Sequence, residues 1–171
     1  MDIISYVIGK NSGGGGGGSY NVLLDTTLTY NSAYKMSSII KEIKPFTVDS
    51  SLTTFENFFN GCSNLLTIPL IDTKSITDMN YCFYNCTKLK NVPVLDTSSL
   101  LVANNSFNGC NALTDESLDN ILQMCINAKK FTGTPTLYYL GFRKQKYSQA
   151  KLESLPHWAD FVAAGWETGY F

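Results

Sequence analysis

Charge is scarce in this sequence. Asp, Glu, Lys and Arg make up 16% of the 171 residues, and the formal net charge is -1. So small a charge gives no broad field that would attract DNA, RNA or an anionic membrane, and nucleic acid is not an expected partner. Long apolar runs are also missing. No stretch approaches the roughly 18 apolar residues of a transmembrane helix, so no membrane span is expected.

The N-terminus lacks the pattern of a secretory signal and that of a phosphate-binding loop. Asp2 stands where a signal is basic, and the apolar run after it is short and lacks a small-residue cleavage site. The glycines at 13–18 follow Lys10 instead of preceding it, which excludes a P-loop. We therefore expect no export by the ordinary route, and we interpret residues 1–20 as an apolar anchor on a flexible glycine tether, with a fraying terminus as the alternative. The candidate anchor residues, which would dock the chain into a larger assembly, are Ile3, Ile4, Tyr6, Val7 and Ile8.

A 24-residue repeat occupies the middle of the chain. FNGCSNLLTIPLIDT at 59–73 returns as FYNCTKLKNVPVLDT at 83–97, and three copies align as 43–66, 67–90 and 91–114. A constant period of this size is typical of a solenoid, in which equivalent residues of successive coils stack at roughly the 4.8 Å spacing of β-strands. We call each such set of equivalent residues a row. The predicted structural rows are Pro45, Pro69 and Pro93; Phe59, Phe83 and Phe107; Cys62, Cys86 and Cys110; and Leu65, Leu89 and Leu113.

The cysteines are predicted to be reduced and buried. A zinc site needs ligands that converge, typically as C-x₂₋₄-C pairs, and the cysteine row, with one member per coil, does not supply them. Cys82 and Cys86 are separated by three residues, but the only histidine, His157, is far off in the sequence. A disulfide between neighbouring coils is sterically allowed but would leave one thiol of the row unpaired. Cysteine is best interpreted here as a small apolar filler, and Cys125 as a core residue of a helix.

The repeat unit F-x-N/G-C-x-x-L-x-x-I/V-P-x-L/I-D-T resembles the BspA-type leucine-rich repeat. This family occurs on bacterial surface proteins and in tail or fibre proteins of phages that infect gut Firmicutes. The resemblance implies an α/β solenoid: a short, right-handed stack of leucine-rich-repeat coils over residues 43–114, with a helical C-terminal cap. Residues 21–42 are then interpreted as the N-terminal cap, because the open end of a repeat stack must be covered.

Residues 115–171 are predicted to form the C-terminal cap, which begins with a helix. LTDESLDNILQMCINAKK offers Thr114 or Asp115 as the N-cap, acids in the first turn, and Lys129 and Lys130 in the last turn. One face of this helix is apolar, and we expect it to lie over the last coil. That face comprises Leu118, Ile121, Leu122 and Cys125.

The rest of the cap is predicted to be a strand followed by helices. TPTLYYLGF at 134–142 is expected to be the strand, and SQAKLESLPHWADFVAAGW at 148–166 one or two short helices interrupted near Pro156. The expected buried anchors are Trp158, Phe161 and Trp166. LTDESLDNILQMCINA, LYYLGF and the closing W-x-x-F-x-x-A-G-W-x-T-G-Y resemble the cap that follows these repeats in phage structural proteins. The opening ISYVIGK-N-SGGGGGG resembles the start of the same class, which favours a phage protein over a secreted adhesin.

No catalytic, metal or cofactor site is predicted. Cys125 with His157, the single histidine, is the only thiol–imidazole candidate, and ordinary packing explains that histidine more simply. Asp72 and Asp96 share a row, where we expect the carboxylates to accept turn hydrogen bonds. Their spacing would not exclude a glycosidase-like pair, but nothing in the sequence indicates a cleft.

What remains is a contact surface rich in tyrosine. Tyrosine on a charge-poor surface suits contact with protein or glycan, although capping of the core is the alternative for each ring. We therefore expect a non-enzymatic virion protein that binds other virion proteins through its N-terminus and a host-surface protein or glycan through this surface, with self-association left open. A bacterial cell-surface adhesin of the same repeat family and a cell-wall hydrolase are the alternatives. The candidate binding residues are Tyr81, Tyr84, Tyr138 and Tyr139.

Overall fold

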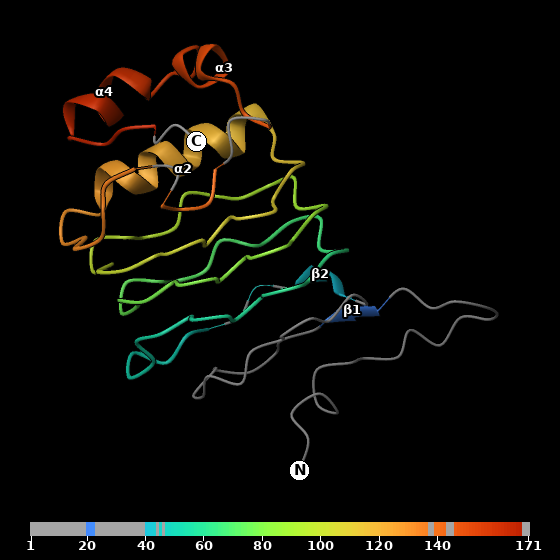
Figure 1. The fold of residues 1–171 in the computed structure, drawn as a ribbon. Helices are drawn as coiled ribbons and strands as arrows, with labels where there is room; N and C mark the ends of the chain where they lie inside the picture. Colours follow the sequence, from blue (N-terminus) through green and yellow to red (C-terminus); the bar gives the residue numbers. More distant parts are fainter. Residues whose placement is uncertain are drawn as a thin grey trace.

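A computed structural model describes residues 20–22, 40–43, 45, 47–136, 139–142 and 146–168 of the chain. Two short strands lie at one end of a stack of coils, and the helices lie at the other end (Figure 1). The candidate anchor residues at 3–8 and Tyr138 fall outside the described residues, as does most of the expected N-terminal cap. The elements in chain order are β1 (Tyr20–Val22), β2 (Ile40–Ile43), α2 (Asp115–Asn127), α3 (Gln149–Glu153) and α4 (Trp158–Ala163).

β1 and β2 form a parallel pair that adjoins the first coil. Tyr20 lies opposite Ile40, and Val22 lies opposite Ile43. β2 is also hydrogen-bonded to the first coil, because Leu66 N–H donates to the Lys41 carbonyl at 3.0 Å. The side chains of Ile40 and Ile43 are buried, so β2 places one apolar face on the core.

Between β2 and α2 the chain runs as coils, and residues 24 apart lie in neighbouring coils (Figure 1). Parallel bridges join Thr54 to Asp78 and Asp78 to Val102, and a second set joins Thr67 to Asn91. Short irregular coils still satisfy their backbone polar groups, because N–H groups of one coil donate to carbonyls of the next. Such bonds, each 2.8 Å long and with the donor first, join Asn57 to Asn80, Phe59 to Cys82, Gly61 to Tyr84, Tyr81 to Asn104, and Phe83 to Ser106.

Each coil bends through two backbone positions with left-handed φ. One row contains Asn57, Tyr81 and Asn105, and the other contains Gly61, Asn85 and Gly109, with φ between 54° and 85°. Glycine and asparagine tolerate this conformation better than other residues, which explains their abundance at these bends. Tyr81 is the exception, because a bulky side chain is disfavoured there.

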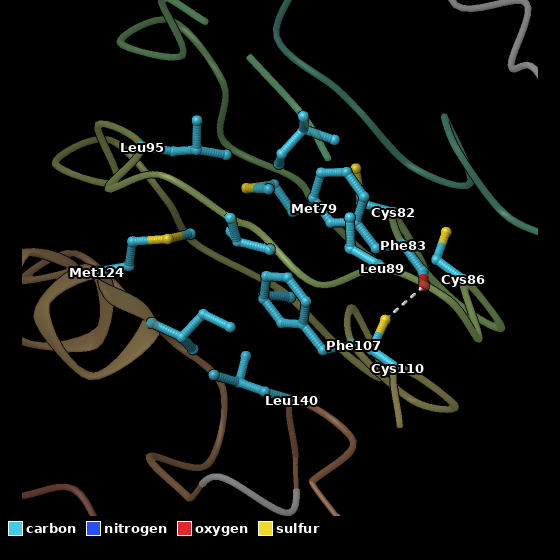
Figure 2. Close-up of a cluster of buried hydrophobic side chains, with 14 of the residues drawn as sticks. Met79, Cys82, Phe83, Cys86, Leu89, Leu95, Phe107, Cys110, Met124 and Leu140 are labelled. Atoms are coloured by element: carbon cyan, nitrogen blue, oxygen red, sulfur yellow. Dashed lines mark hydrogen bonds between the residues drawn. The ribbon is translucent and has the colours of Figure 1, made fainter. Parts of the chain in front are cut away.

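Rows of apolar side chains fill the interior of the stack. The rings of Phe59 and Phe83 lie 5.3 Å apart with an interplanar angle of 8°, and those of Phe83 and Phe107 lie 5.4 Å apart at 16°. Figure 2 shows Phe83 and Phe107 side by side, with the sulfur of Met79 and side chains of the cap around them. The members of the cysteine and leucine rows are also buried: Cys62, Cys86, Cys110, Leu65, Leu89 and Leu113. Of the proline row, Pro45 is exposed, and Pro69 and Pro93 are partly exposed.

α2 covers the last coil. Thr114 is its N-cap, and the Thr114 Oγ1 accepts a hydrogen bond from Ser117 N–H at 3.3 Å. The helix ends at Asn127, where Ala128 leaves helical geometry, so Lys129 and Lys130 lie beyond the helix and not in its last turn as expected. The apolar face of α2 is buried on the stack through Leu118, Ile121, Leu122 and Cys125.

The segment at 134–142 differs from the expected strand in its described residues. Thr136 makes one isolated bridge, to Glu167, and residues 139–141 form a turn. Gly141 has φ +96°, and a Cβ there would lie 2.5 Å from the Asn108 nitrogen. The segment bends because it follows the curve of the last coil, where Asn105 N–H donates to the Tyr139 carbonyl at 2.7 Å.

α3 and α4 complete the cap, with a break at residues 154–157 that contains Pro156. Phe161 and Trp166 are buried, whereas Trp158 is only half-buried and stacks on Phe161 with ring centroids 5.4 Å apart. α4 packs on α2, which places it on the outer side of the cap (Figure 1).

Candidate contact surface

The thiols lie inside the stack and bond to its backbone. All five cysteines are free and buried. Cys86 Sγ donates to the Phe59 carbonyl at 3.2 Å, and Cys110 Sγ donates to the Phe83 carbonyl at 3.1 Å, the contact drawn as a dashed line in Figure 2. Burial raises the pKa of the Cys82 thiol well above its usual value. Neutral thiols of this kind are poor nucleophiles and poor metal ligands, so they serve packing.

The single histidine pairs with α2 rather than with a thiol. His157 Nδ1 lies 2.7 Å from Asp119 Oδ2, and the His157 backbone N–H donates to Asp119 Oδ1 at 2.8 Å. The other ring nitrogen, Nε2, lies 2.7 Å from Gln123 Nε2. Among the described residues no hydrogen bond joins Cys125 to His157, and burial raises the pKa of the Cys125 thiol. The histidine therefore ties the start of α4 to α2.

Asp119 and Gln123 were not identifiable as partners of His157 from the sequence. They stand four residues apart on one face of α2, which is a detectable helical spacing. However, their partner is 38 residues further along the chain than Asp119. No local pattern links positions that far apart.

The aspartates of the repeat hold turns, as predicted. Asp72 Oδ1 accepts from Lys74 N–H at 3.1 Å, and Asp96 Oδ1 accepts from Ser98 N–H at 2.9 Å. The hydrogen bonds from Ser98 lower the pKa of the Asp96 carboxyl, which keeps it ionised and occupied with its own turn. An open hollow of 510 Å³ lies between this turn and the end of α2, and its lining includes Asp96 and Lys129.

Two of the candidate tyrosines lie together on the surface. The side chain of Tyr81 is 38% exposed, Tyr84 is half-buried, and their ring centroids are 5.6 Å apart at an interplanar angle of 65°. Tyr139 does not join them, because its ring packs edge-on against Phe131 at 5.8 Å. Tyr147 is structural, because its hydroxyl donates to the Cys110 carbonyl at 2.6 Å.

The surface around the tyrosine pair is uncharged and rich in amides. We define the asparagine face as residues 56–64, 80–88 and 104–112, one bend from each of three coils. These 27 positions include nine asparagines, and only Glu56 and Lys88 carry charge. The equivalent bends stack because their backbones are hydrogen-bonded from coil to coil, as described above.

Within this face the two rows that contain the tyrosines have a regular pattern. In the first coil Asn60 Nδ2 donates to Asn57 Oδ1 at 2.7 Å, and in the third coil Asn108 Nδ2 donates to Asn105 Oδ1 at 3.0 Å. Tyr81 and Tyr84 occupy the same two rows in the middle coil. The 24-residue period contains this signal, because aligning the copies places the two tyrosines directly between asparagines.

Over the described ranges, no group of three or more His, Cys, Asp or Glu side chains is placed to hold a metal ion. Within the same residues, none of the helices has both the length and the apolar character needed to cross a bilayer. Comparison with known protein families, curated proteins and solved structures finds no match to this chain.

Proposed function

We propose that this chain is a non-enzymatic phage virion protein. It is a short solenoid of BspA-type leucine-rich repeats, displayed on the particle for binding to the host surface or to neighbouring subunits. The observation that carries the proposal is the asparagine face: three stacked bends present one continuous, nearly uncharged surface with a tyrosine pair in which Tyr81 is exposed and Tyr84 half-buried. Such a surface suits contact, whereas the five thiols are buried in the core and the imidazole of His157 is paired with Asp119.

The rigidity of the stack supports this role. Each bend of the asparagine face contains a buried Phe ring that stacks on the ring of a neighbouring coil. Backbone hydrogen bonds also join each bend to a neighbouring coil. A surface held in one conformation before binding loses little conformational entropy when a partner arrives. Tyrosine adds a large contact area with few rotatable bonds and a hydroxyl that remains polar.

Particle composition tests the location. Virions are purified on a density gradient from a lysate of the strain that encodes the chain, and peptides from residues 47–136 are measured by mass spectrometry. We expect these peptides to band with capsid and tail proteins in constant ratio. Release of the chain from intact, uninfected cells by surface proteolysis, with none in the particles, would instead establish the bacterial adhesin.

A second assay addresses chemistry. The purified chain is incubated with cell walls of the host, and soluble sugars and peptides are measured over time. We expect no release above that of a heat-inactivated sample. Fragment release that survives further purification would replace the contact role with a hydrolase.

A further inference from the structure

The middle coil departs from its neighbours at two surface positions. Where the first and third coils carry hydrogen-bonded asparagine pairs, the middle coil carries Tyr81 and Tyr84 in ring contact. Asparagine pairs suit these bends because the amide side chains bond to each other across one turn. The aromatic pair is therefore not what the bend itself requires.

Tyr81 also takes a backbone conformation that favours asparagine. Its φ is +54°, close to the values of Asn57 and Asn105 in the same row, 58° and 54°. A bulky residue in this region is strained, and strain that persists at an exposed side chain points to a function for that side chain. A local choice that conflicts with the backbone is expected at functional sites. Core packing does not explain it, because the Tyr81 side chain is 38% exposed.

We infer that the Tyr81–Tyr84 pair binds one sugar ring of a neutral glycan. A pyranose has an apolar face of C–H groups and a rim of hydroxyls, and it needs a flat apolar partner beside hydrogen-bonding groups. The exposed ring of Tyr81 offers the flat partner, and the phenol hydroxyls offer polar contact at its edge. Each asparagine amide has two N–H groups and two acceptor lone pairs, so the Asn57–Asn60 and Asn105–Asn108 bonds leave capacity for sugar hydroxyls on both sides of the rings.

Charge and surroundings favour a glycan over a protein. With Glu56 and Lys88 as its only charged residues, the asparagine face would not select an acidic sugar or a charged peptide. The core of a protein interface is typically an aromatic or arginine anchor amid other apolar groups. Here the rings lie among amides, and the exposed leucines at 66, 70 and 101 belong to other parts of the coils.

This inference rests on the proposed contact function, and it names the partner of that surface. One tyrosine pair can stack on one ring, so we expect weak binding by a single chain. Many copies on one particle would convert weak contacts into firm attachment.

Calorimetric titration of the full chain provides the test. The probes are cellohexaose, maltohexaose, xylohexaose, mannohexaose and chitohexaose, with an oligogalacturonate as the acidic comparison. We expect at least one neutral hexasaccharide to bind and the acidic one not to. The variants Tyr81→Asn and Tyr84→Asn restore the residues of the neighbouring coils and should each weaken binding about tenfold or more. Leu70→Asn makes the same apolar-to-amide change at a 70% exposed side chain away from the face, and it should bind like the unaltered chain.

Stability separates recognition from a structural role. Tyr81→Asn places the tolerant residue at the left-handed position, so its melting temperature should equal or exceed that of the unaltered chain while binding falls. The inference would be overturned if the chain bound none of the neutral probes. It would also be overturned if Tyr81→Asn and Tyr84→Asn bound the probe as tightly as the unaltered chain. Capture of a host protein that is lost in the same variants, without glycan binding, would overturn it too. Presence of the chain in particles is measured independently, so failure here leaves the virion proposal standing, and absence from particles leaves the glycan site standing.

Discussion

At the scale of the residue, Gly109 shows why one row of bends alternates between glycine and asparagine. Its φ is +85°, and a Cβ there would lie 2.4 Å from Asn85 Oδ1 and 3.0 Å from Asn85 Cα. Two neighbouring coils approach closely at this position, so the absence of a side chain at Gly109 leaves room for that of Asn85. Gly61, in the same row on the other side of Asn85, also has a left-handed φ, of 78°.

The substitution Gly109→Ala should therefore be strongly destabilising. The left-handed φ alone disfavours alanine by about 1 kcal/mol, and the clash with the Asn85 backbone adds to this, for a total of roughly 2–4 kcal/mol. Gly165→Ala is the matched control, because Gly165 has the same φ of +85° and no heavy atom within 4 Å of the added carbon. Urea denaturation gives the free energy of unfolding of both variants. Equal losses would show that close coil contact does not matter at Gly109.

Tyr147 is a residue whose contribution to stability depends on pH. Its hydroxyl donates to the Cys110 carbonyl and accepts from Leu113 N–H at 3.1 Å, and burial raises its pKa from 10 to about 12. The neutral phenol is thus favoured in the folded state. This stabilisation is complete below pH 10 and is lost as the pH rises from 10 to 12, because the unfolded chain releases the proton first.

Tyr147→Phe should lower the free energy of unfolding at pH 7 by about 1–2 kcal/mol through the lost hydrogen bonds. The difference between the variant and the unaltered chain should shrink as the pH rises from 10 to 12. Denaturation curves at several pH values measure both effects. A difference that stays constant up to pH 11 would contradict the role assigned to the phenol.

At the scale of the element, a partly buried contact and an exposed one join α2 to the two later helices. Asp119 accepts two hydrogen bonds from His157 and is 14% exposed, whereas Asp115 pairs with Lys151 of α3 and is 69% exposed. Buried charge-assisted hydrogen bonds stabilise more than exposed ion pairs, which solvent screens.

We expect Asp119→Ala to cost about 1–3 kcal/mol and to speed hydrogen exchange over α4. Asp115→Ala should cost less than about 1 kcal/mol, since it removes an exposed ion pair and one first-turn acid. Denaturant titration and exchange mass spectrometry distinguish the two variants. If exchange in α4 were unchanged in Asp119→Ala, the histidine contact would not hold that helix.

The elements differ in how far the sequence could predict them. The start of α2 follows from local signals, Thr114 before two acids and an apolar face, and the structure has Thr114 as its N-cap. The predicted strand at 134–142 was wrong over the residues that the structure describes there. Its residue types favour a β-strand, and the local sequence does not show that the segment must follow the curve of the last coil. Gly141, which has φ +96°, was a local hint of a bend. The His157 contacts depend on how the cap folds back, which no local pattern contains.

At the scale of the whole molecule, the period of the sequence and the offset of the coils coincide at 24 residues. Sequence alignment of the copies therefore identifies which residues are neighbours in space, including the tyrosines that replace two asparagines. It could not give the orientation of the rings or the exposure of Tyr81, because those depend on how bends of different coils pack. The contact residues at the N-terminus and Tyr138 remain predictions, since they lie outside the described residues.

Thiol reactivity reports on the integrity of the entire stack. The five cysteines lie in successive coils and in α2, and each is at most 4% exposed. Burial raises the pKa of Cys82 and Cys125, so little reactive thiolate is present even where reagent could enter.

We expect Ellman's reagent to react with the native chain at least about a thousandfold more slowly than with the unfolded chain, in which all five thiols react. Added urea should raise the native rate in step with global unfolding, because no cysteine becomes accessible until the coils separate. One thiol that reacts quickly in the absence of denaturant would reveal a coil that opens alone, and its position, identified by peptide mapping, would show where the stack is weakest.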